Sequence, residues 1–340
     1  MSKQPVPVTG SGVAPSNAIK SYSKRARVVR ENLELYSLAI PMICFLLVFN
    51  YRPMYGVIIA FQNYFPGRPF LFATTAERAA GTAISGIVSP TIRWVGLANF
   101  KDFWNSIYFG RIITNTIRLS LLGLAFNFWV PIIFALLLNE VRHLGYKKFV
   151  QTASYLPYFI SMVVVAGMAI TFVNPTGLVN IFLGKFGVAP KAYLDNASTY
   201  PAIYTIINCW KNFGFGSVLY FSTISAIDVS LYESARIDGG NRWQQCWHIT
   251  LPGLRFIIMV QFILAIGGLL NGNTDLTILI YKAATYEKSD IIGSFIYRQG
   301  IENQKYSYTT AVGLFMSAIG FTLTYAANKA SNKITGFGLW

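Results

Sequence analysis

Long apolar runs alternate with short polar stretches along most of this chain. A helix needs about 20 apolar residues to cross the roughly 30 Å hydrocarbon core of a bilayer. Six segments reach that length, at about Leu33–Phe61, Ile112–Leu138, Thr152–Val173, Tyr200–Ile224, Leu254–Tyr281 and Tyr308–Asn328. The pattern therefore predicts an all-α integral membrane protein with six transmembrane helices.

Two of these segments carry polar interruptions. The first contains Asn50-Tyr51-Arg52-Pro53, which predicts a break near the outer interface, where tyrosine rings anchor. The fifth contains Gly267, Gly268 and Gly272, and glycines at this depth predict a broken helix that lines a cavity. Between the first two segments, about Gln62–Arg111, no apolar run is long enough to span, so we expect a loop with short local structure.

The stretch Glu233–Pro252 separates the fourth and fifth apolar segments. Ser230 followed by Glu233 predicts a capping box that starts a short helix, and Gly239-Gly240 predicts its end. Asn241 followed by Gln244 predicts a second helix start, which Leu251-Pro252 would end. We expect two short amphipathic helices joined by a tight glycine bend at a membrane surface.

The distribution of basic residues predicts the orientation. Six crossings place both termini on one side, together with Glu233–Pro252 and the loop that holds Arg142, Lys147 and Lys148. Cytoplasmic loops carry the excess of Lys and Arg, and loops near the first span usually dominate. The basic N-terminal cluster therefore predicts cytoplasmic termini in a bacterial cell membrane. The loop after the fifth segment argues against this orientation, because it would be extracellular and yet holds four basic residues, Lys282, Lys288, Arg298 and Lys305.

Composition supports a membrane protein and excludes several other classes. The chain is 54% hydrophobic and only 12% charged, about half the charge of a soluble domain. The net charge of +15 is scattered over loops without a dense basic stripe, which argues against nucleic-acid binding. Three cysteines without a C-x-x-C pair and two histidines favour neither a disulfide framework, a metal site nor a Ser/His catalytic pair.

Residues of the Glu233–Pro252 stretch resemble a known family motif. Glu233-Ser234-Ala235, Asp238-Gly239-Gly240 and Ile249-Thr250-Leu251-Pro252 are similar to the EAA loop of ATP-binding-cassette (ABC) importer permeases. Ser234 and Gly240 stand where that family has alanine, and Trp243 stands where aromatic residues are common. The segments NYRPMYGVIIAF and VGLANFKDFW resemble the carbohydrate-uptake branch, in particular the LplB-like polysaccharide-fragment permeases.

The resemblance implies a type I ABC importer transmembrane domain. Residues 112–328 would form the shared core, 33–111 a first helix with a long extracytoplasmic loop, 1–32 a partly disordered basic N-terminus and 329–340 a cytoplasmic tail. It further implies a cytoplasmic ATPase dimer, a second and generally different permease, an extracellular sugar-binding protein and an oligosaccharide substrate. No G-x-x-x-x-G-K-[ST] motif occurs in this chain, so ATP and Mg²⁺ would bind the separate ATPase. We expect this chain itself to bind no cofactor and no metal.

Candidate coupling residues follow from the same motif: Glu233, Ser234, Ala235, Asp238, Gly239, Gly240, Trp243, Leu251 and Pro252. In the family, the glutamate reaches into a cleft on the ATPase, although Glu233 could also serve only as a helix cap. The tryptophans Trp243 and Trp247 could either enter the ATPase groove or form an interfacial aromatic belt.

Polar residues inside the fifth segment are candidates for the sugar pathway. An unpaired carboxylate in lipid is costly, so Asp275 should face protein or water, together with Asn271 and Asn273. Sugars need polar partners for their hydroxyls and aromatic rings for their apolar faces. The fourth segment could supply those rings through Trp210, Phe213, Phe215 and Tyr220. A helix kink with internal hydrogen bonds is the alternative, and Asn115 and Asn127 are expected to join helices.

Two other functions remain as alternatives. A membrane enzyme would need paired acids, a Ser/Lys or Ser/His pair, or H-E-x-x-H at depth, and the sequence shows none of these. An ion-coupled secondary transporter acting alone would not need a docking loop of this kind. The sequence therefore favours an importer permease without catalytic residues.

Overall fold

The computed structural model describes residues 32–69, 71–72, 75–81, 89, 91–336 and 338–339. The chain forms two units, Met1–Val57 and Ile58–Trp340. The described residues are almost entirely helical or loop, with one isolated antiparallel bridge between Gln62 and Trp94. This confirms the all-α prediction. The N-terminal basic cluster on which the orientation was based lies outside the described residues.

The helix that begins in the first unit is α2, Leu33–Leu46, followed by a π-helical turn at Leu47–Tyr51 and by α3, Arg52–Met54. The polar interruption at Asn50–Pro53 does not end the helix, because helical geometry continues through it. The Arg52 N–H donates to the Leu47 carbonyl five residues back. This wider turn just before Pro53 accommodates a residue that has no N–H to donate.

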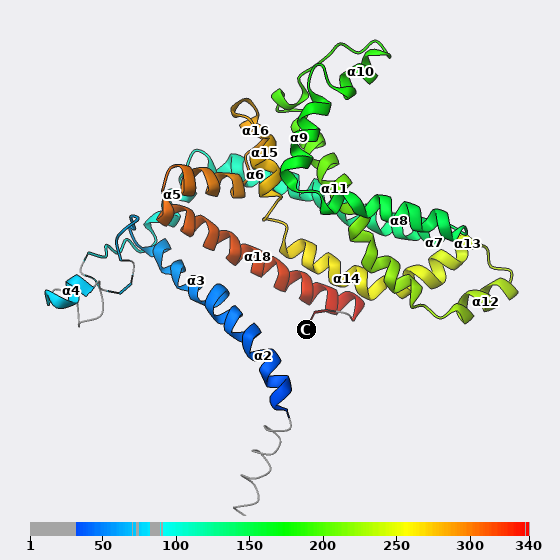
Figure 1. Ribbon diagram of the computed structural model, residues 1–340, viewed down its shortest axis with the longest axis horizontal. Helices are drawn as coiled ribbons and strands as arrows, with labels where there is room; N and C mark the ends of the chain where they lie inside the picture. Colours follow the sequence, from blue (N-terminus) through cyan, green and yellow to red (C-terminus); the bar gives the residue numbers. More distant parts are fainter. Residues whose placement is uncertain are drawn as a thin grey trace, which may run out of the picture. The chain divides into compact units, whose positions relative to one another are not determined.

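The second unit holds the remaining helices (Figure 1). They are α4 Thr75–Ala79, α5 Ala98–Trp104, α6 Phe109–Gly123, α7 Trp129–Asn139, α8 Leu144–Phe159, α9 Met162–Val173, α10 Leu178–Gly184, α11 Tyr200–Ser225, α12 Val229–Ile237, α13 Arg242–Gln245, α14 Leu251–Gly267, α15 Thr274–Ile280, α16 Tyr286–Ser289, α17 Ile292–Ile296 and α18 Tyr306–Thr335. The short helices α4 and α5 confirm local structure between the first two spans.

Long apolar helices overlap each of the predicted spans. Over the described residues, helices long and apolar enough to cross a membrane are Tyr36–Phe61, Phe109–Asn139, Met162–Gly184, Arg242–Gly267 and Tyr306–Lys333. A bent pair, Tyr200–Ser225 with Val229–Ile237, completes the set, with 68° between its two helices. The bend lies where α11 ends and α12 begins.

The third predicted span is wrong in its first half. Thr152–Phe159 belongs to α8, which ends before an extended Ile160, and α9 starts afresh at Met162. The Ser161 hydroxyl accepts the Val164 N–H at 3.4 Å and so caps the new helix. α8 instead packs along α11, where a Cβ on Gly214 would lie 1.9 Å from the Ser154 carbonyl oxygen.

The predicted helix end at Leu251-Pro252 is also wrong. The helix that starts at Arg242 runs through a π-helical turn, Cys246–Thr250, directly into α14. The Leu251 N–H donates to the Cys246 carbonyl, five residues back, so Pro252 enters without a break. By contrast, the predicted break at the glycines is confirmed, because α14 ends at Gly267 and α15 begins only at Thr274.

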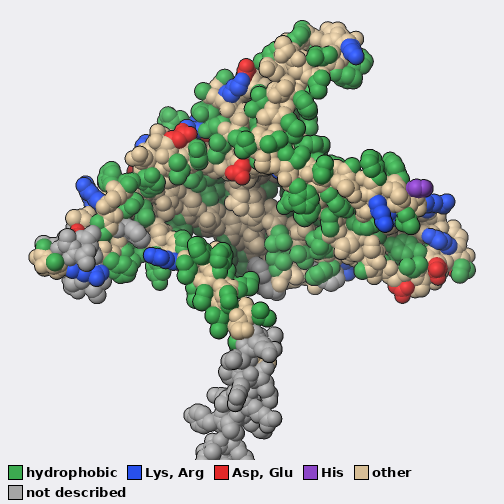
Figure 2. All heavy atoms as spheres, in the orientation of Figure 1, with side chains coloured by type: hydrophobic (Ala, Val, Ile, Leu, Met, Phe, Trp, Pro, Cys, Tyr) green, Lys and Arg blue, Asp and Glu red, His purple; other side chains and the backbone are tan. Residues whose placement is uncertain are grey.

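α11 lies at the centre of the packing in the second unit. It contacts α7, α8 and α14, and α14 in turn lies along α18, as Figure 1 shows. Buried side chains of α11 enter two of the apolar clusters, through Tyr200, Tyr204 and Ile207 near α9 and α15, and through Tyr220 and Ile224 near α7 and α14. Figure 2 shows charged side chains gathered at the end of this unit where α12 and α13 lie.

Candidate functional site

The helix α12 has its N-cap two residues earlier than the sequence suggested. Asp228 is its N-cap, and its side chain accepts the Ser230 N–H at 2.9 Å. This backbone hydrogen bond holds the pKa of the Asp228 carboxyl below its ordinary value. The predicted capping box between Ser230 and Glu233 is therefore wrong. The Glu233 side chain is exposed and makes no hydrogen bond or ion pair with the described part of the chain.

A left-handed glycine forms the corner after α12. Gly239 has φ +79°, and its N–H donates to the Arg236 carbonyl at 3.1 Å. The next residue, Gly240, packs against the backbone of α12, and a Cβ there would lie only 2.7 Å from the Ala235 carbonyl oxygen. Both glycine predictions are confirmed, since a larger residue at either position would meet backbone strain or backbone atoms.

The predicted capping box at the next helix start is confirmed. Asn241 accepts the Gln244 N–H at 2.8 Å, and the Gln244 side chain accepts the Asn241 N–H at 2.7 Å. Two paired bonds hold the chain at the point where it re-enters a helix. The direction of α13 is thereby fixed relative to the glycine corner.

Further contacts tie this corner to the spans. The Tyr232 hydroxyl lies 3.0 Å from the Thr250 hydroxyl, and the Gln245 side chain donates to the Gly240 carbonyl at 2.9 Å. Arg242 pairs with Glu140, at the end of α7, at 3.3 Å. A displacement of α12 would therefore be passed to the helices that end here.

The outer face of α12 and α13 is apolar and exposed. Val229, Glu233 and Ile237 follow one another at four-residue spacing and share one side of α12. Ile237 is 86% exposed, and Trp243 is 70% exposed and packs edge-to-face with Trp247 at 5.9 Å. Leu251 is half-buried and Pro252 is exposed. Glu233 thus lies between two exposed apolar side chains on α12, and two exposed tryptophans follow it after the glycine corner.

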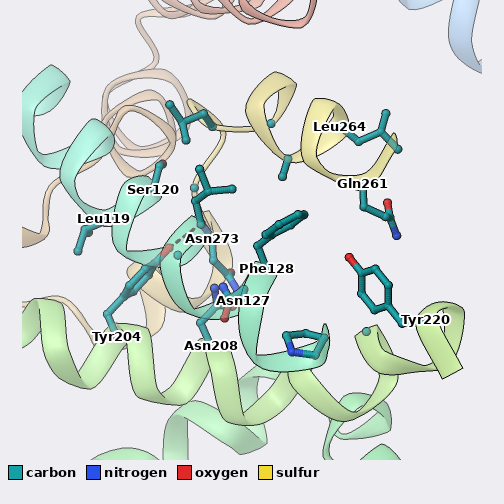
Figure 3. Close-up of a pocket in the computed structure, with 18 residues that line it drawn as sticks. Leu119, Ser120, Asn127, Phe128, Tyr204, Asn208, Tyr220, Gln261, Leu264 and Asn273 are labelled. Atoms are coloured by element: carbon teal, nitrogen blue, oxygen red, sulfur yellow. Dashed lines mark hydrogen bonds between the residues drawn. The ribbon is translucent and has the colours of Figure 1, made fainter. Parts of the chain in front are cut away.

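A cavity of about 380 Å³ lies between α6, α7, α11, α14 and the loop of residues 268–273 (Figure 3). Its polar side chains are Ser120, Asn127, Tyr204, Asn208, Tyr220, Gln261 and Asn273. Figure 3 shows Asn127, Asn208 and Asn273 grouped on one side of Phe128, and Tyr220 and Gln261 on the other. No charged side chain is among the described residues that line this cavity, which we call the central cavity.

Hydrogen bonds hold the loop against α11 in this cavity. The Tyr204 hydroxyl accepts the Asn273 N–H at 2.7 Å, and the Asn273 side chain donates to the Asn208 side chain at 2.9 Å. Asn273 also caps α15 by accepting the Leu276 N–H at 3.0 Å. The break between α14 and α15 is thus fixed by polar contacts, as the alternative of a hydrogen-bonded kink predicted.

Two polar atoms in the cavity wall have no partner. The Ser120 hydroxyl and the Asn127 side-chain oxygen are buried and unpaired within the described part of the chain. Asn115 differs, because its amide donates to carbonyls of Tyr286, Glu287 and Asp290 at 3.4, 2.9 and 3.2 Å. Asn115 thus joins helices as predicted, whereas the Asn127 side-chain oxygen has no such bond to a neighbouring helix within the described part of the chain.

The predicted pathway residues lie in three separate places. Tyr220 and Asn273 line the central cavity. Asn271 and Asp275, again with Asn273, line a second cavity of about 580 Å³ on the far side of the loop. Trp210 and Phe213 line a third, largely apolar cavity of about 700 Å³ against α6.

The aromatic residues of α11 have different neighbours. Tyr204 and Asn208, one turn apart, line the central cavity, and Tyr220 lines it further along the helix. Trp210 and Phe213 line the cavity against α6, and Phe215 instead stacks on Tyr158 at 4.1 Å. Tyr204, Asn208, Gln261 and Asn127 were missed, although the spacing of Tyr204 and Asn208 could have indicated a shared face.

A buried ion cluster also escaped the sequence analysis. Asp290 is fully buried and accepts hydrogen bonds from Arg298 at 3.1 and 2.6 Å and from Arg111 at 3.3 Å. Burial alone would lower the pKa of Arg298, but the hydrogen bonds and charge of Asp290 outweigh it and raise that pKa. The cluster ties the start of α6 to the segment around α17. A second pair, Lys282 with Asp195, is exposed.

Comparison with known proteins identifies the family. Residues 127–334 match the family described as binding-protein-dependent transport system inner membrane component. The chain belongs to this family. The permease is 34% identical to the protein LplB of Bacillus subtilis, over 99% of this chain and 97% of that protein. It is 35% identical to YteP of the same organism, a polygalacturonan/rhamnogalacturonan transport system permease, over 93% and 94% of the two chains.

A solved structure supports the same fold. The permease is 35% identical to a chain in the crystal structure of a bacterial ABC transporter involved in the import of the acidic polysaccharide alginate. The similarity covers 92% of this chain and 99% of that chain, with a TM-score of 0.79. The predicted type I ABC importer fold is therefore confirmed, and the protein is a multi-pass permease subunit of an ABC importer.

Proposed function

We propose that this permease carries oligosaccharides or polysaccharide fragments across the bacterial cell membrane, driven by separate ATPase subunits that dock on α12 and the Gly239 corner. The main observation in support of this proposal is the course of α11. Its side chains line the central cavity, and its end turns through 68° into the exposed α12. One helix thus connects a polar cavity among the spans to a docking surface at their end.

Coupling follows from these contacts. When two ATPase subunits close around ATP and Mg²⁺, they displace α12, and the bonds at Thr250, Gly240 and Glu140 pass this displacement to α14 and α7. The spans then rock about the central cavity, which opens to one side of the membrane and then to the other. This chain binds no nucleotide, metal or other cofactor in this proposal.

The chemistry of the central cavity suits a sugar. Hydroxyl and amide side chains can bind sugar hydroxyls, and Phe128 offers a ring for the apolar face of a sugar. Relatives are named for polygalacturonan/rhamnogalacturonan and for arabinooligosaccharides, and the solved relative imports alginate. The wall contains no carboxylate among its described residues that would repel an acidic sugar.

The partners follow from the same comparisons. A related alginate transporter has been solved in complex with a periplasmic protein bound to an alginate pentasaccharide. We infer that an extracellular sugar-binding protein delivers the substrate and that a second permease, a different chain, completes the pathway. The two permeases would together bind one ATPase dimer.

Both termini and α12 face the cytoplasm in this proposal. The basic loop after the fifth span argues against that orientation. Lys282 pairs with Asp195, and Arg298 pairs with Asp290. Because the orientation rule counts Lys and Arg rather than net charge, these pairs do not change the count, and the proposed orientation rests on the basic loop of Arg142, Lys147 and Lys148 and on the family resemblance.

Replacing Asn127 by leucine tests the sugar site. We expect KM for sugar uptake to rise about tenfold, because one hydrogen bond to the substrate is lost. The fold should keep its stability, since the Asn127 oxygen has no partner in the described structure. The matched variant Asn115→Leu should instead destabilise the protein by about 2–3 kcal/mol, because it removes the hydrogen bonds that the Asn115 amide donates to three backbone carbonyls. An unchanged KM in Asn127→Leu would remove this residue from the pathway.

Replacing Glu233 by glutamine tests the docking surface. We expect affinity for the ATPase to fall about tenfold or more, because a buried charge pair across the interface loses one partner. Binding of detergent-solubilised permease to immobilised ATPase measures this loss. Glu302→Gln, at another exposed glutamate beyond the fifth span, should leave the affinity unchanged. Equal affinity in wild type and Glu233→Gln would show that this glutamate does not contact the ATPase.

Proteoliposomes test the function as a whole. The permease pair, the ATPase and the binding protein should take up oligosaccharide only with ATP and Mg²⁺. Uptake driven by an ion gradient without nucleotide would contradict the proposal and favour a secondary transporter.

A further inference from the structure

A buried lysine lies in the middle of α11. Lys211 is only 8% exposed and sits about 17 Å along the helix from Tyr200, at 1.5 Å per residue. A charge at such depth is rare and costly in a membrane helix. No acidic side chain among the described residues pairs with Lys211, so its partners must be other groups.

Those partners are carbonyl groups at the end of α8. The Lys211 ammonium donates to the carbonyl oxygens of Pro157, Tyr158 and Ile160 at 3.3, 2.7 and 2.6 Å. An ammonium has three donors, and three acceptors surround this one. The last carbonyls of a helix lack helical partners and carry its negative dipole end, so a cation is favoured there. Lys211 therefore caps α8 where the chain breaks before α9.

Neighbouring contacts join the same two helices. Gly214, one turn after Lys211, lies against the Ser154 carbonyl so closely that a Cβ would come within 1.9 Å. Phe215 stacks on Tyr158, with ring centroids 4.1 Å apart and an angle of 10° between the rings. The Lys211 ammonium also lies 5.6 Å from the centre of the Tyr158 ring. Polar, backbone and aromatic contacts thus coincide within one turn of α11.

We propose that Lys211 is a positioning residue that locks α8 and α11 into one rigid unit, through which movement of α12 reaches the central cavity. The inference rests on the proposed function. Tyr204 and Asn208, which hold the cavity loop, precede Lys211 in α11, whereas α12 follows the other end of the helix. A displacement of α12 that travels along α11 passes the level of Lys211 before it reaches those residues.

Neutral and charged substitutions separate this role from simple packing. In Lys211→Met, we expect complex assembly and basal ATP hydrolysis to persist, while binding-protein-stimulated hydrolysis and uptake fall about tenfold or more. Lys211→Arg should keep most of the stimulated hydrolysis and most of the uptake, because a guanidinium also donates to carbonyls. Lys185→Met, at an exposed lysine outside the spans, should match wild type. Uptake by Lys211→Met within about twofold of wild type would overturn the proposal.

A cross-link tests the rigid unit even if Lys211→Met fails to assemble. Cysteines at Tyr158 and Phe215, with Cys44, Cys209 and Cys246 replaced by serine, can be joined by oxidation or a short bis-maleimide. The proposal predicts that the joined permease keeps at least about half of its ATP-driven uptake, because the two helices do not separate during the cycle. Loss of uptake on oxidation, with recovery on reduction, would overturn it. Absence of ATP-driven uptake in the cysteine-free permease that keeps Tyr158 and Phe215 would instead contradict the proposed function.

Discussion

Gly239→Pro should reduce ATP-driven sugar uptake and binding-protein-stimulated ATP hydrolysis about a hundredfold, because proline cannot adopt the corner after α12. Gly239 has φ +79°, whereas proline is fixed near −65°, and the Gly239 N–H bond to Arg236 would be lost. The backbone at this corner must then adopt another conformation, which changes the angle between α12 and α13. Proteoliposomes with the full complex measure both activities.

Gly187 provides a matched control for this variant. It also has positive φ, +80°, its N–H donates to Gly184 at 3.0 Å, and nothing lies within 4 Å of its Cβ position, as at Gly239. Gly187→Pro imposes the same local strain after α10, far in sequence from the docking surface. We expect it to keep coupled uptake. If Gly239→Pro retains both activities, or if Gly187→Pro loses them equally, the corner has no special role in coupling.

Asp290→Asn should destabilise the protein by about 3–5 kcal/mol, because it leaves the partly buried guanidinium groups of Arg298 and Arg111 without a carboxylate. The effect is large because the Asp290 side chain is fully buried and cannot be replaced by water. Thermal unfolding of the purified permease in detergent measures it as a lower midpoint.

The exposed pair between Lys282 and Asp195 is the matched control. Both side chains are about half exposed, at 54% and 51%, so Asp195→Asn should cost only about 0–1 kcal/mol. Added salt should diminish this small effect. Similar midpoints for the two variants would show that the Asp290 cluster contributes no more than a surface pair.

Local signals in the sequence predicted the parts of the fold that depend on local physics. The left-handed Gly239 and the capping box of Asn241 and Gln244 follow from side-chain size and hydrogen bonding within a few residues. Apolar length predicted the spans. The Ser230–Glu233 capping box failed because Asp228, two residues earlier, already caps the helix and leaves Ser230 inside its first turn.

Contacts distant in sequence decided the features that the sequence analysis missed. The break between α8 and α9 depends on Lys211, which lies about fifty residues further along and satisfies the freed carbonyls. Pro252 suggested a helix end, but the preceding π-helical turn accommodates it. Likewise, Asp290 and Arg111 pair across 179 positions, a separation that no local pattern reveals.

The candidate sugar pathway likewise contains residues that the sequence predicted and residues that it did not. Asn273 and Tyr220 were predicted and do line the central cavity, whereas Trp210 and Phe213 line a different cavity against α6. Residue type alone indicated what a sugar site needs. Only the helix packing shows which face of α11 meets α14, and so which polar residues meet.

Labelling of single cysteines tests the central claim, that α12 offers a cytoplasmic docking surface to the ATPase. Ile237 on α12 and Ile107 before α6 are equally exposed, at 86% and 87%. In a background without native cysteines, a membrane-impermeant maleimide should label Ile237→Cys only in inverted vesicles, and bound ATPase should block that labelling. Ile107→Cys should react only in right-side-out vesicles. Labelling of Ile237→Cys in right-side-out vesicles, or labelling that the ATPase leaves unchanged, would contradict the account.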